Sequence, residues 1–168
     1  MPQQRTLVVY YSRSGTTRKV GEALAQMLGG EVDEIVEIRG RSGVFGYLRS
    51  LVEARRQVSS PISPEKRDPS AYDLVIVGTP VWAWSVSSPV RAYLMATRER
   101  LPDVAFFCTL GGAGDARAFA QMQSIAGRVP RAVCAIAARD VASGRYRERL
   151  AEFARALEPL AVAKPTAA

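Results

Sequence analysis

The sequence contains no histidine and only two cysteines, which excludes several kinds of catalytic site at once. Without histidine there is no imidazole general base, no histidine-activated nucleophile and no histidine metal ligand. Cys108 and Cys134 both fall in segments that we predict to be strands, where we expect small buried hydrophobic residues. Unpaired buried cysteines are typical of a reducing compartment, so we expect a cytoplasmic protein.

Long apolar runs are also missing. No stretch approaches the roughly 18 residues that a membrane span requires. The chain passes from Met1 into its first predicted strand within a few residues, so we expect no secretory signal. The 168 residues suffice for one domain with a core. We expect a single domain over residues 1–160 and a disordered tail over residues 161–168.

Acidic residues are the minority among the charged ones. The chain has 23 Lys and Arg against 16 Asp and Glu, a net charge of +7. The basic residues are spread along the chain without a long block, so we expect no nucleic-acid partner. One interpretation is a solvated basic surface. The other is long-range attraction of an acidic redox partner protein or an anionic substrate.

Apolar runs and helical patterns alternate from end to end. We predict strands at residues 7–11, 32–38, 74–77, 104–110 and 132–137, the second as an edge strand and the third as a central one. Helical patterns cover residues 16–28, 44–58, 88–94, 115–126 and 146–157. We expect Ser88 and Asp115 to cap their helices and Gly29 and Gly127 to end theirs. The pattern predicts an α/β protein of three layers, a five-stranded parallel sheet with helices on both faces.

A loop rich in hydroxyl groups follows the first strand and opens directly into a helix. It reads Ser12, Arg13, Ser14, Gly15, Thr16, Thr17. Backbone N–H groups, hydroxyls and the positive end of a helix converge there, an arrangement that binds phosphate. A Walker loop and a dinucleotide fingerprint both require further glycines, whereas Gly15 stands alone. The alternative is a turn whose hydroxyls only cap the helix.

Both tryptophans lie in the segment after the third strand, residues 78–88, which we predict to be a loop. The candidate ligand-binding residues in it are Thr79, Pro80, Val81, Trp82, Ala83 and Trp84. A flat aromatic ligand would explain indoles in a loop, and the alternative is an indole folded inward as a hydrophobic anchor. We expect one indole to fold inward, and Trp82 or its backbone to face the ligand.

The segment after the fourth strand is rich in glycine. The candidate residues in it are Thr109, Leu110, Gly111, Gly112 and Gly114. A backbone without side chains allows a ring to approach closely and leaves N–H and C=O groups free to bond its polar edge.

Together, residues 6–24, 72–94 and 109–122 resemble the flavodoxin-like FMN proteins, and the order of elements matches across nearly the whole chain. The pattern Ser12-x-Ser14-Gly15-x-Thr17 is similar to their phosphate loop. The resemblance implies the strand order 2-1-3-4-5, with the ligand crevice at the carboxyl ends of strands 1 and 3. It also implies FMN as cofactor, with its phosphate on residues 12–17 and its ring between the two later loops.

The chain departs from the carrier flavodoxins of this group in two ways. They are typically acidic, whereas this chain is basic, and many of them have a flavin-stacking tyrosine that the third loop lacks. The resemblance therefore leaves the protein partners open. A helix over residues 40–58, with Phe45 and Tyr47, either shapes a substrate pocket or simply covers the sheet.

Three functions follow from these observations. The first is an FMN-dependent oxidoreductase that transfers electrons from NAD(P)H to a quinone or similar small acceptor. The second is a one-electron carrier of the flavodoxin type, and the third is a binding module without redox function. The flavin would carry the chemistry, so we expect no catalytic side chain and no metal. The sequence shows no nicotinamide fingerprint and leaves the oligomeric state open.

Overall fold

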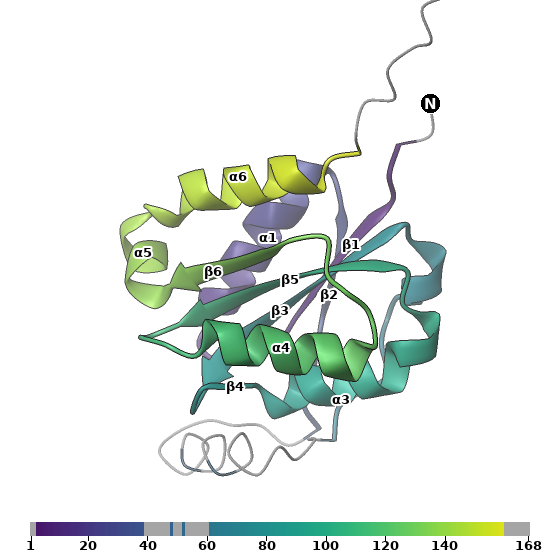
Figure 1. Cartoon of the computed structure of the whole chain (residues 1–168), viewed down its shortest axis with the longest axis horizontal. Coiled ribbons are helices and arrows are strands. Elements are labelled where there is room, and N and C mark those ends of the chain that lie inside the picture. Colours follow the sequence, from purple (N-terminus) through teal and green to yellow (C-terminus); the bar gives the residue numbers. More distant parts are fainter. Residues whose placement is uncertain (1–2, 39–47, 49–51, 53–60, 160–168) are drawn as a thin grey trace, which may run out of the picture.

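The computed structural model describes residues 3–38, 48, 52 and 61–159 (Figure 1). Its strands are β1 (Thr6–Tyr10), β2 (Glu31–Glu34), β3 (Leu74–Trp82), β4 (Ser85–Val86), β5 (Asp103–Leu110) and β6 (Val133–Ala137). Its helices are α1 (Thr16–Leu28), α3 (Ser88–Thr97), α4 (Asp115–Ala126), α5 (Ala138–Ser143) and α6 (Tyr146–Leu157). Two short 3-10 turns are η1 (Pro69–Ala71) and η2 (Arg98–Arg100).

The sheet confirms the predicted topology. Its order is β2-β1-β3-β5-β6, and each neighbouring pair along this path is parallel. The strands at residues 103–110 and 133–137 are the fourth and fifth of the prediction. The short β4 pairs antiparallel with the end of β3. In Figure 1, α1 and α6 lie on one face of the sheet and α3 and α4 on the other, which gives three layers.

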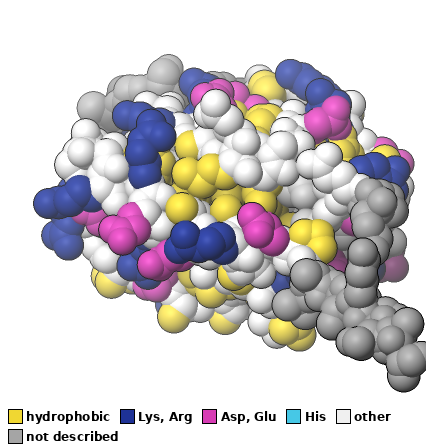
Figure 2. Space-filling view, turned by 90° about the horizontal axis from the view of Figure 1, so that it is seen from above, with side chains coloured by type: hydrophobic (Ala, Val, Ile, Leu, Met, Phe, Trp, Pro, Cys, Tyr) yellow, Lys and Arg dark blue, Asp and Glu magenta, His cyan; other side chains and the backbone are white. Residues whose placement is uncertain are grey.

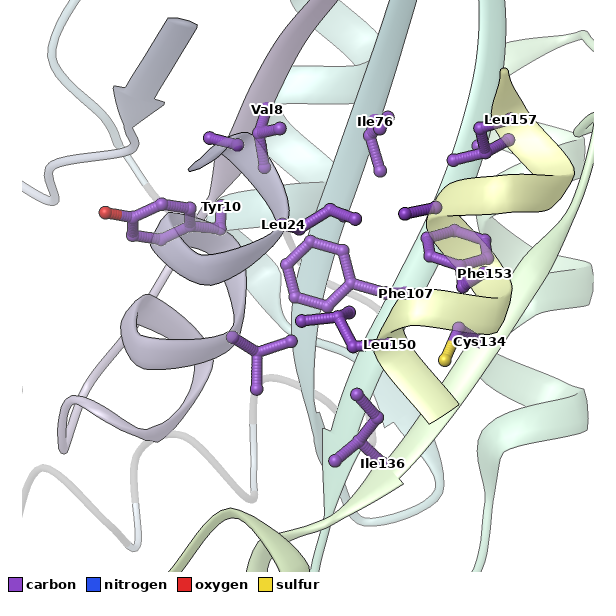
Figure 3. Packing of buried hydrophobic residues seen from close by; sticks show 14 of the residues in the cluster. Val8, Tyr10, Leu24, Ile76, Phe107, Cys134, Ile136, Leu150, Phe153 and Leu157 are labelled. Carbon is purple, nitrogen blue, oxygen red and sulfur yellow. The ribbon is translucent and has the colours of Figure 1, made fainter. Parts of the chain in front are cut away.

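Two hydrophobic cores fill the spaces between the layers because alternate residues of each strand point to opposite faces. Val8 faces the core beneath α1 and α6, whereas Val9 faces the core beneath α3 and α4. Figure 3 shows the Phe107 ring among side chains of α1 and α6. A Cβ at Gly78 would lie 2.0 Å from Cζ of Phe107, so only glycine leaves room for this ring.

The third strand is much longer than predicted. We expected it to end at Val77 and placed residues 78–88 in a loop, but β3 continues to Trp82. The prediction was wrong for two reasons: residues 78–80 pair with β5, far along the chain, and residues 81–82 pair with β4 across a tight turn that lacks the asparagine or glycine typical of such turns. Pro80 pairs with Thr109 of β5, and Val81 pairs with Val86 of β4. The second strand is shorter than predicted, ending at Glu34, and lies at the sheet edge as expected.

The helix ends confirm some of the predicted caps and correct others. Gly29 and Gly127 end α1 and α4 in the left-handed conformation, as expected. Ser88 and Asp115 are not caps, because each is the first residue of its helix. The N-caps are Ser87 and Gly114, and neither helix has a side-chain cap hydrogen bond.

Further along the chain, the prediction missed α5, which lies between β6 and α6. Most of the helix predicted over residues 44–58, and the tail from residue 161, lie outside the described residues. Both cysteines are buried and unpaired, as expected. In the part of the chain that the structure describes, no helix is long and apolar enough to cross a membrane.

Candidate cofactor-binding site

The loop after β1 leads into α1 without a side chain that caps the helix. Gly15 is the N-cap residue, with a φ of 94°, a left-handed conformation that favours glycine. Its N–H donates to Oγ of Ser12 over 3.1 Å, which closes the loop. The first turn of α1 carries no acidic residue. Because the first N–H groups of a helix have no acceptor within the helix, this end is suited to an anion.

The four hydroxyls of this loop differ in what they contact. Oγ of Ser14 and Oγ1 of Thr16 lie 3.4 Å apart and are exposed. Oγ1 of Thr17 is buried and lies 2.8 Å from Oγ1 of Thr109, so this hydrogen bond joins the loops after β1 and β5. The Ser12 hydroxyl accepts a hydrogen bond from the N–H of Gly15. Ser14 and Thr16 are therefore the hydroxyls directed outward at the helix end.

The β3–β4 hairpin is held by buried polar contacts. Oγ1 of Thr79 accepts from the N–H of Ser87 over 3.0 Å and donates to the carbonyl of the next residue over 2.8 Å. Gln121 of α4 accepts from the N–H of Val86 over 3.0 Å and donates to Oγ of Ser85 over 3.1 Å. These bonds attach the hairpin to α4. The Thr79 hydroxyl forms its hydrogen bonds within the hairpin itself.

The two tryptophans have different environments. The Trp82 ring packs edge-to-face on Tyr11, with 5.6 Å between ring centroids. Trp84 is 58% exposed. Ala83 and Trp84 form the two-residue hairpin turn with φ values of 48° and 58°, a conformation that favours asparagine and glycine. As expected, one indole packs inward while the other stays in solvent.

The glycines of the loop after β5 have two kinds of surroundings: Gly114 lies against the hairpin, whereas Gly111 and Gly112 lie beside open space. Gly114 has a φ of 114°, and a Cβ there would lie 2.7 Å from Cα of Trp84. Trp84 therefore lies directly against Gly114. By contrast, no heavy atom lies within 4 Å of a Cβ built on Gly111 or Gly112. The crevice is closed toward the hairpin tip and open beside these two glycines.

A cavity of about 140 Å³ lies where the three loops meet. The predicted residues that line it are Arg13, Ser14, Thr16, Thr17, Pro80, Val81, Trp82, Thr109, Leu110 and Gly111. The predicted residues outside its lining are Ser12, Gly15, Thr79, Ala83, Trp84, Gly112 and Gly114. Pockets for whole ligands have volumes of roughly 300–1,000 Å³, so this cavity is smaller than a pocket for a whole ligand.

Ala138 also lines the cavity, and the sequence analysis missed it. It begins α5, directly after β6. The carboxyl ends of parallel strands meet at one edge of the sheet, so the end of the last strand was the signal that could have indicated it.

Burial holds two titratable side chains of the sheet, Cys108 and Tyr10, in their neutral forms. Burial, together with the charge of Asp115, raises the pKa of the Cys108 thiol to about 12. Burial and the nearby Glu34 and Glu22 carboxylates raise the pKa of Tyr10 to about 12. At neutral pH Cys108 therefore offers no thiolate nucleophile. Among the described residues, no cluster of acidic residues and cysteines is suited to holding a metal ion.

The strand order and the position of the crevice define a class of protein, the doubly wound α/β proteins that bind nucleotides at the carboxyl ends of β1 and β3. The family model of flavodoxin matches residues 5–138, most of the chain. The protein belongs to the flavodoxin family.

Solved structures show the same fold. A flavoprotein of Lactobacillus acidophilus in complex with FMN is 23% identical, with a TM-score of 0.69, over 85% of this chain and 98% of that one. A Bacteroides uniformis flavoprotein is 20% identical, with a TM-score of 0.75, over 92% and 99%. A WrbA-like flavodoxin of Agrobacterium tumefaciens is 17% identical, with a TM-score of 0.53, over 90% and 98%. None of the curated proteins compared with the chain matches it.

Proposed function

We propose that this protein binds FMN in the crevice between the loops after β1, β3 and β5. The donor set at the start of α1 carries the proposal. The helix end lacks a side-chain cap and a first-turn acid, and the exposed hydroxyls of Ser14 and Thr16 adjoin it. A phosphate there would accept hydrogen bonds from the first-turn N–H groups and these hydroxyls, and the helix dipole would favour its charge.

The flavin ring would lie between the hairpin and the glycine-rich loop. Pro80, Val81 and Trp82 form one wall of the cavity, and Leu110 and Gly111 form another. The side chains of Pro80, Trp82 and Leu110 in these walls are apolar, which suits an aromatic ring system. The exposed backbone of Gly111 and Gly112 would be within reach of the polar edge of the ring. The FMN complex of the Lactobacillus acidophilus protein of the same fold supports FMN as the cofactor.

We further propose that NAD(P)H is the electron donor and that a quinone or a similar small molecule is the acceptor. When bound, FMN supplies the hydride and electron transfer. The chain's own residues hold the phosphate, orient the ring and shield one of its faces from water. The acceptor would approach from the open space beside Gly111 and Gly112, where no heavy atom lies within 4 Å of a built Cβ. The two buried free cysteines support a cytoplasmic location.

A one-electron carrier is the second candidate, and the net charge of +7 favours it in one respect. A basic protein attracts an acidic redox partner over long distances. In that case the exposed Trp84 would belong to a surface that meets the partner rather than a small molecule.

Two measurements test these proposals. Titration with FMN should quench flavin fluorescence and yield a protein with a flavin spectrum, and unchanged fluorescence would overturn the FMN assignment. The FMN-loaded protein is then mixed with NADH or NADPH and a soluble quinone. Continuous loss of the nicotinamide absorbance supports the reductase. If no nicotinamide is consumed, but the chemically reduced protein passes electrons to an acidic electron-transfer protein, the carrier is supported instead.

A further inference from the structure

The sheet ends at β6, on the edge opposite β2. In the described part of the chain no strand lies beyond it (Figure 1). The carbonyl of Ala132 accepts from the N–H of Phe106 over 3.2 Å. In a parallel pair, the backbone N–H and C=O groups of alternate residues face the neighbouring strand, so this bond fixes which residues of β6 face β5. The backbone groups of Val133, Ala135 and Ala137 therefore point away from β5. An edge with unpaired backbone groups is a template for another strand.

A groove of about 500 Å³ runs along this edge, between β6 and α6. The buried side chains of Cys134 and Phe153 lie at its base. Figure 2, seen from the side of α6, shows acidic and basic side chains close to one another on this face. The charged residues that line the groove are Arg145, the N-cap residue of α6, and Glu148, Arg149 and Glu152 within α6.

Within one chain this row of charges is only partly matched. Arg145 and Arg149 are four residues apart, as are Glu148 and Glu152, and like charges at that spacing repel, whereas opposite charges three residues apart, as at Arg149 and Glu152, attract. Arg145 pairs with Asp140 over 3.1 Å. Among the described residues, neither Glu148 nor Glu152 has an ion-pair partner. The two carboxylates thus line the groove, and no basic side chain in the described part of the chain pairs with them.

The same row matches an inverted copy of itself. About the midpoint between Glu148 and Arg149, every basic residue has an acidic residue at the mirrored position. If a second α6 lies antiparallel beside the first, Arg145 is opposite Glu152 of the second copy. Glu148 is likewise opposite Arg149 of the second copy. Two-fold symmetry requires this kind of self-complementary surface.

We propose that this edge, formed by β6 and the charged row of α6, is a two-fold interface with a second copy of the chain. The two β6 strands pair antiparallel about Ala135, the middle residue of the strand, and the sheet continues across the dimer. Paired strands lie about 4.8 Å apart, and helices that cover them pack at about 8–10 Å. The interface therefore forms from strands and helices together, and its centre at Ala135 lies three residues before Ala138 of the cavity wall.

Charge reversals test the interface directly. In the dimer, position 148 of each copy lies opposite position 149 of the other. Glu148→Arg therefore places a basic residue opposite Arg149 at both contacts, and Arg149→Glu places an acidic residue opposite Glu148 at both. Each variant alone should be monomeric in analytical ultracentrifugation, whereas the native protein is a dimer. An equimolar mixture of the two variants should restore dimers, because each reversed residue then meets its opposite. Glu22→Arg, on the exposed surface of α1, changes the net charge as Glu148→Arg does and should stay dimeric.

A backbone variant tests the strand pairing independently. Ala135→Pro removes an N–H that points away from β5, so the ladder with β5 stays intact while the pairing of two β6 strands is lost. We expect a monomer with the native affinity for FMN, which shows that it is folded. A native protein that sediments as a monomer overturns the proposal and leaves the edge to a strand of another protein. A dimer unaffected by either charge reversal overturns it as well.

Discussion

The loop of residues 12–17 and the hairpin of residues 79–88 are both rich in hydroxyl groups, yet the structure uses those groups in opposite ways. In the loop, the Ser14 and Thr16 hydroxyls are exposed at a helix end without a cap. In the hairpin, the Thr79 hydroxyl is completely buried and both donates and accepts within the chain. Composition alone does not distinguish a site that binds a ligand from one that binds its own chain.

The difference lies in whether partners are supplied from within the protein. The hairpin turns back on β3 and brings Ser87 to Thr79, while α4 brings Gln121 to Ser85. At the loop, Thr17 bonds to Thr109 and Ser12 accepts from Gly15, whereas the exposed Ser14 and Thr16 hydroxyls contact only each other among the described residues. Substitutions in the hairpin should therefore change stability, and substitutions in the loop should change cofactor affinity.

The largest loss of stability is expected for Gly114→Ala. The new Cβ would lie 2.7 Å from backbone Cα of Trp84, and alanine is strained at a φ of 114°. Strain and overpacking together should lower the free energy of unfolding by on the order of 3 kcal/mol. Urea unfolding measures the loss. Gly112→Ala is the control, because open space surrounds it, and an equal loss there would contradict the explanation.

Ser14→Ala should weaken FMN binding and leave the fold intact. It removes one hydrogen bond to a charged phosphate, a contribution of roughly 1.5–3 kcal/mol, so the Kd should rise about tenfold or more. Fluorescence titration gives the Kd, and urea unfolding of the apo protein should match the native protein. An unchanged Kd would remove Ser14 from the phosphate site.

Thr79→Val should show the opposite pattern. Valine fills the same space but leaves the buried N–H of Ser87 without its acceptor, which costs about 1–3 kcal/mol of unfolding free energy. FMN affinity, measured below the unfolding transition, should be close to native. A large rise in Kd without loss of stability would mean that Thr79 contacts the cofactor.

The smallest effect is expected at the hairpin tip, and it is a gain. Ala83 has a φ of 48°, a conformation that asparagine tolerates better than alanine. Ala83→Asn should therefore raise the unfolding free energy by about 0.5 kcal/mol. Thermal unfolding of the apo protein measures it, with Ala113→Asn in the neighbouring exposed loop as the comparison. A lower melting temperature for Ala83→Asn would contradict the assigned turn conformation.

Much of the fold could be predicted because its signals are local. The buried strands carry continuous apolar runs, and Gly29 and Gly127 mark helix ends that the structure confirms. The end of β3 could not be predicted in this way. Residues 78–80 pair with β5, which no local pattern shows, and residues 81–82 pair with β4 across a turn, Ala83-Trp84, without the asparagine or glycine that would mark it.

For the candidate site, the chain itself determined which segments meet, because a parallel sheet of this order brings the loops after β1, β3 and β5 to one edge. Only the tertiary structure decided the role of each residue in those loops. It directed Trp82 inward and Trp84 outward, joined Thr17 to Thr109, and brought Ala138 to the cavity. The physical reason is that a side chain's partners are set by contacts between distant segments, whereas the order of strands and helices follows from periodicity within each segment.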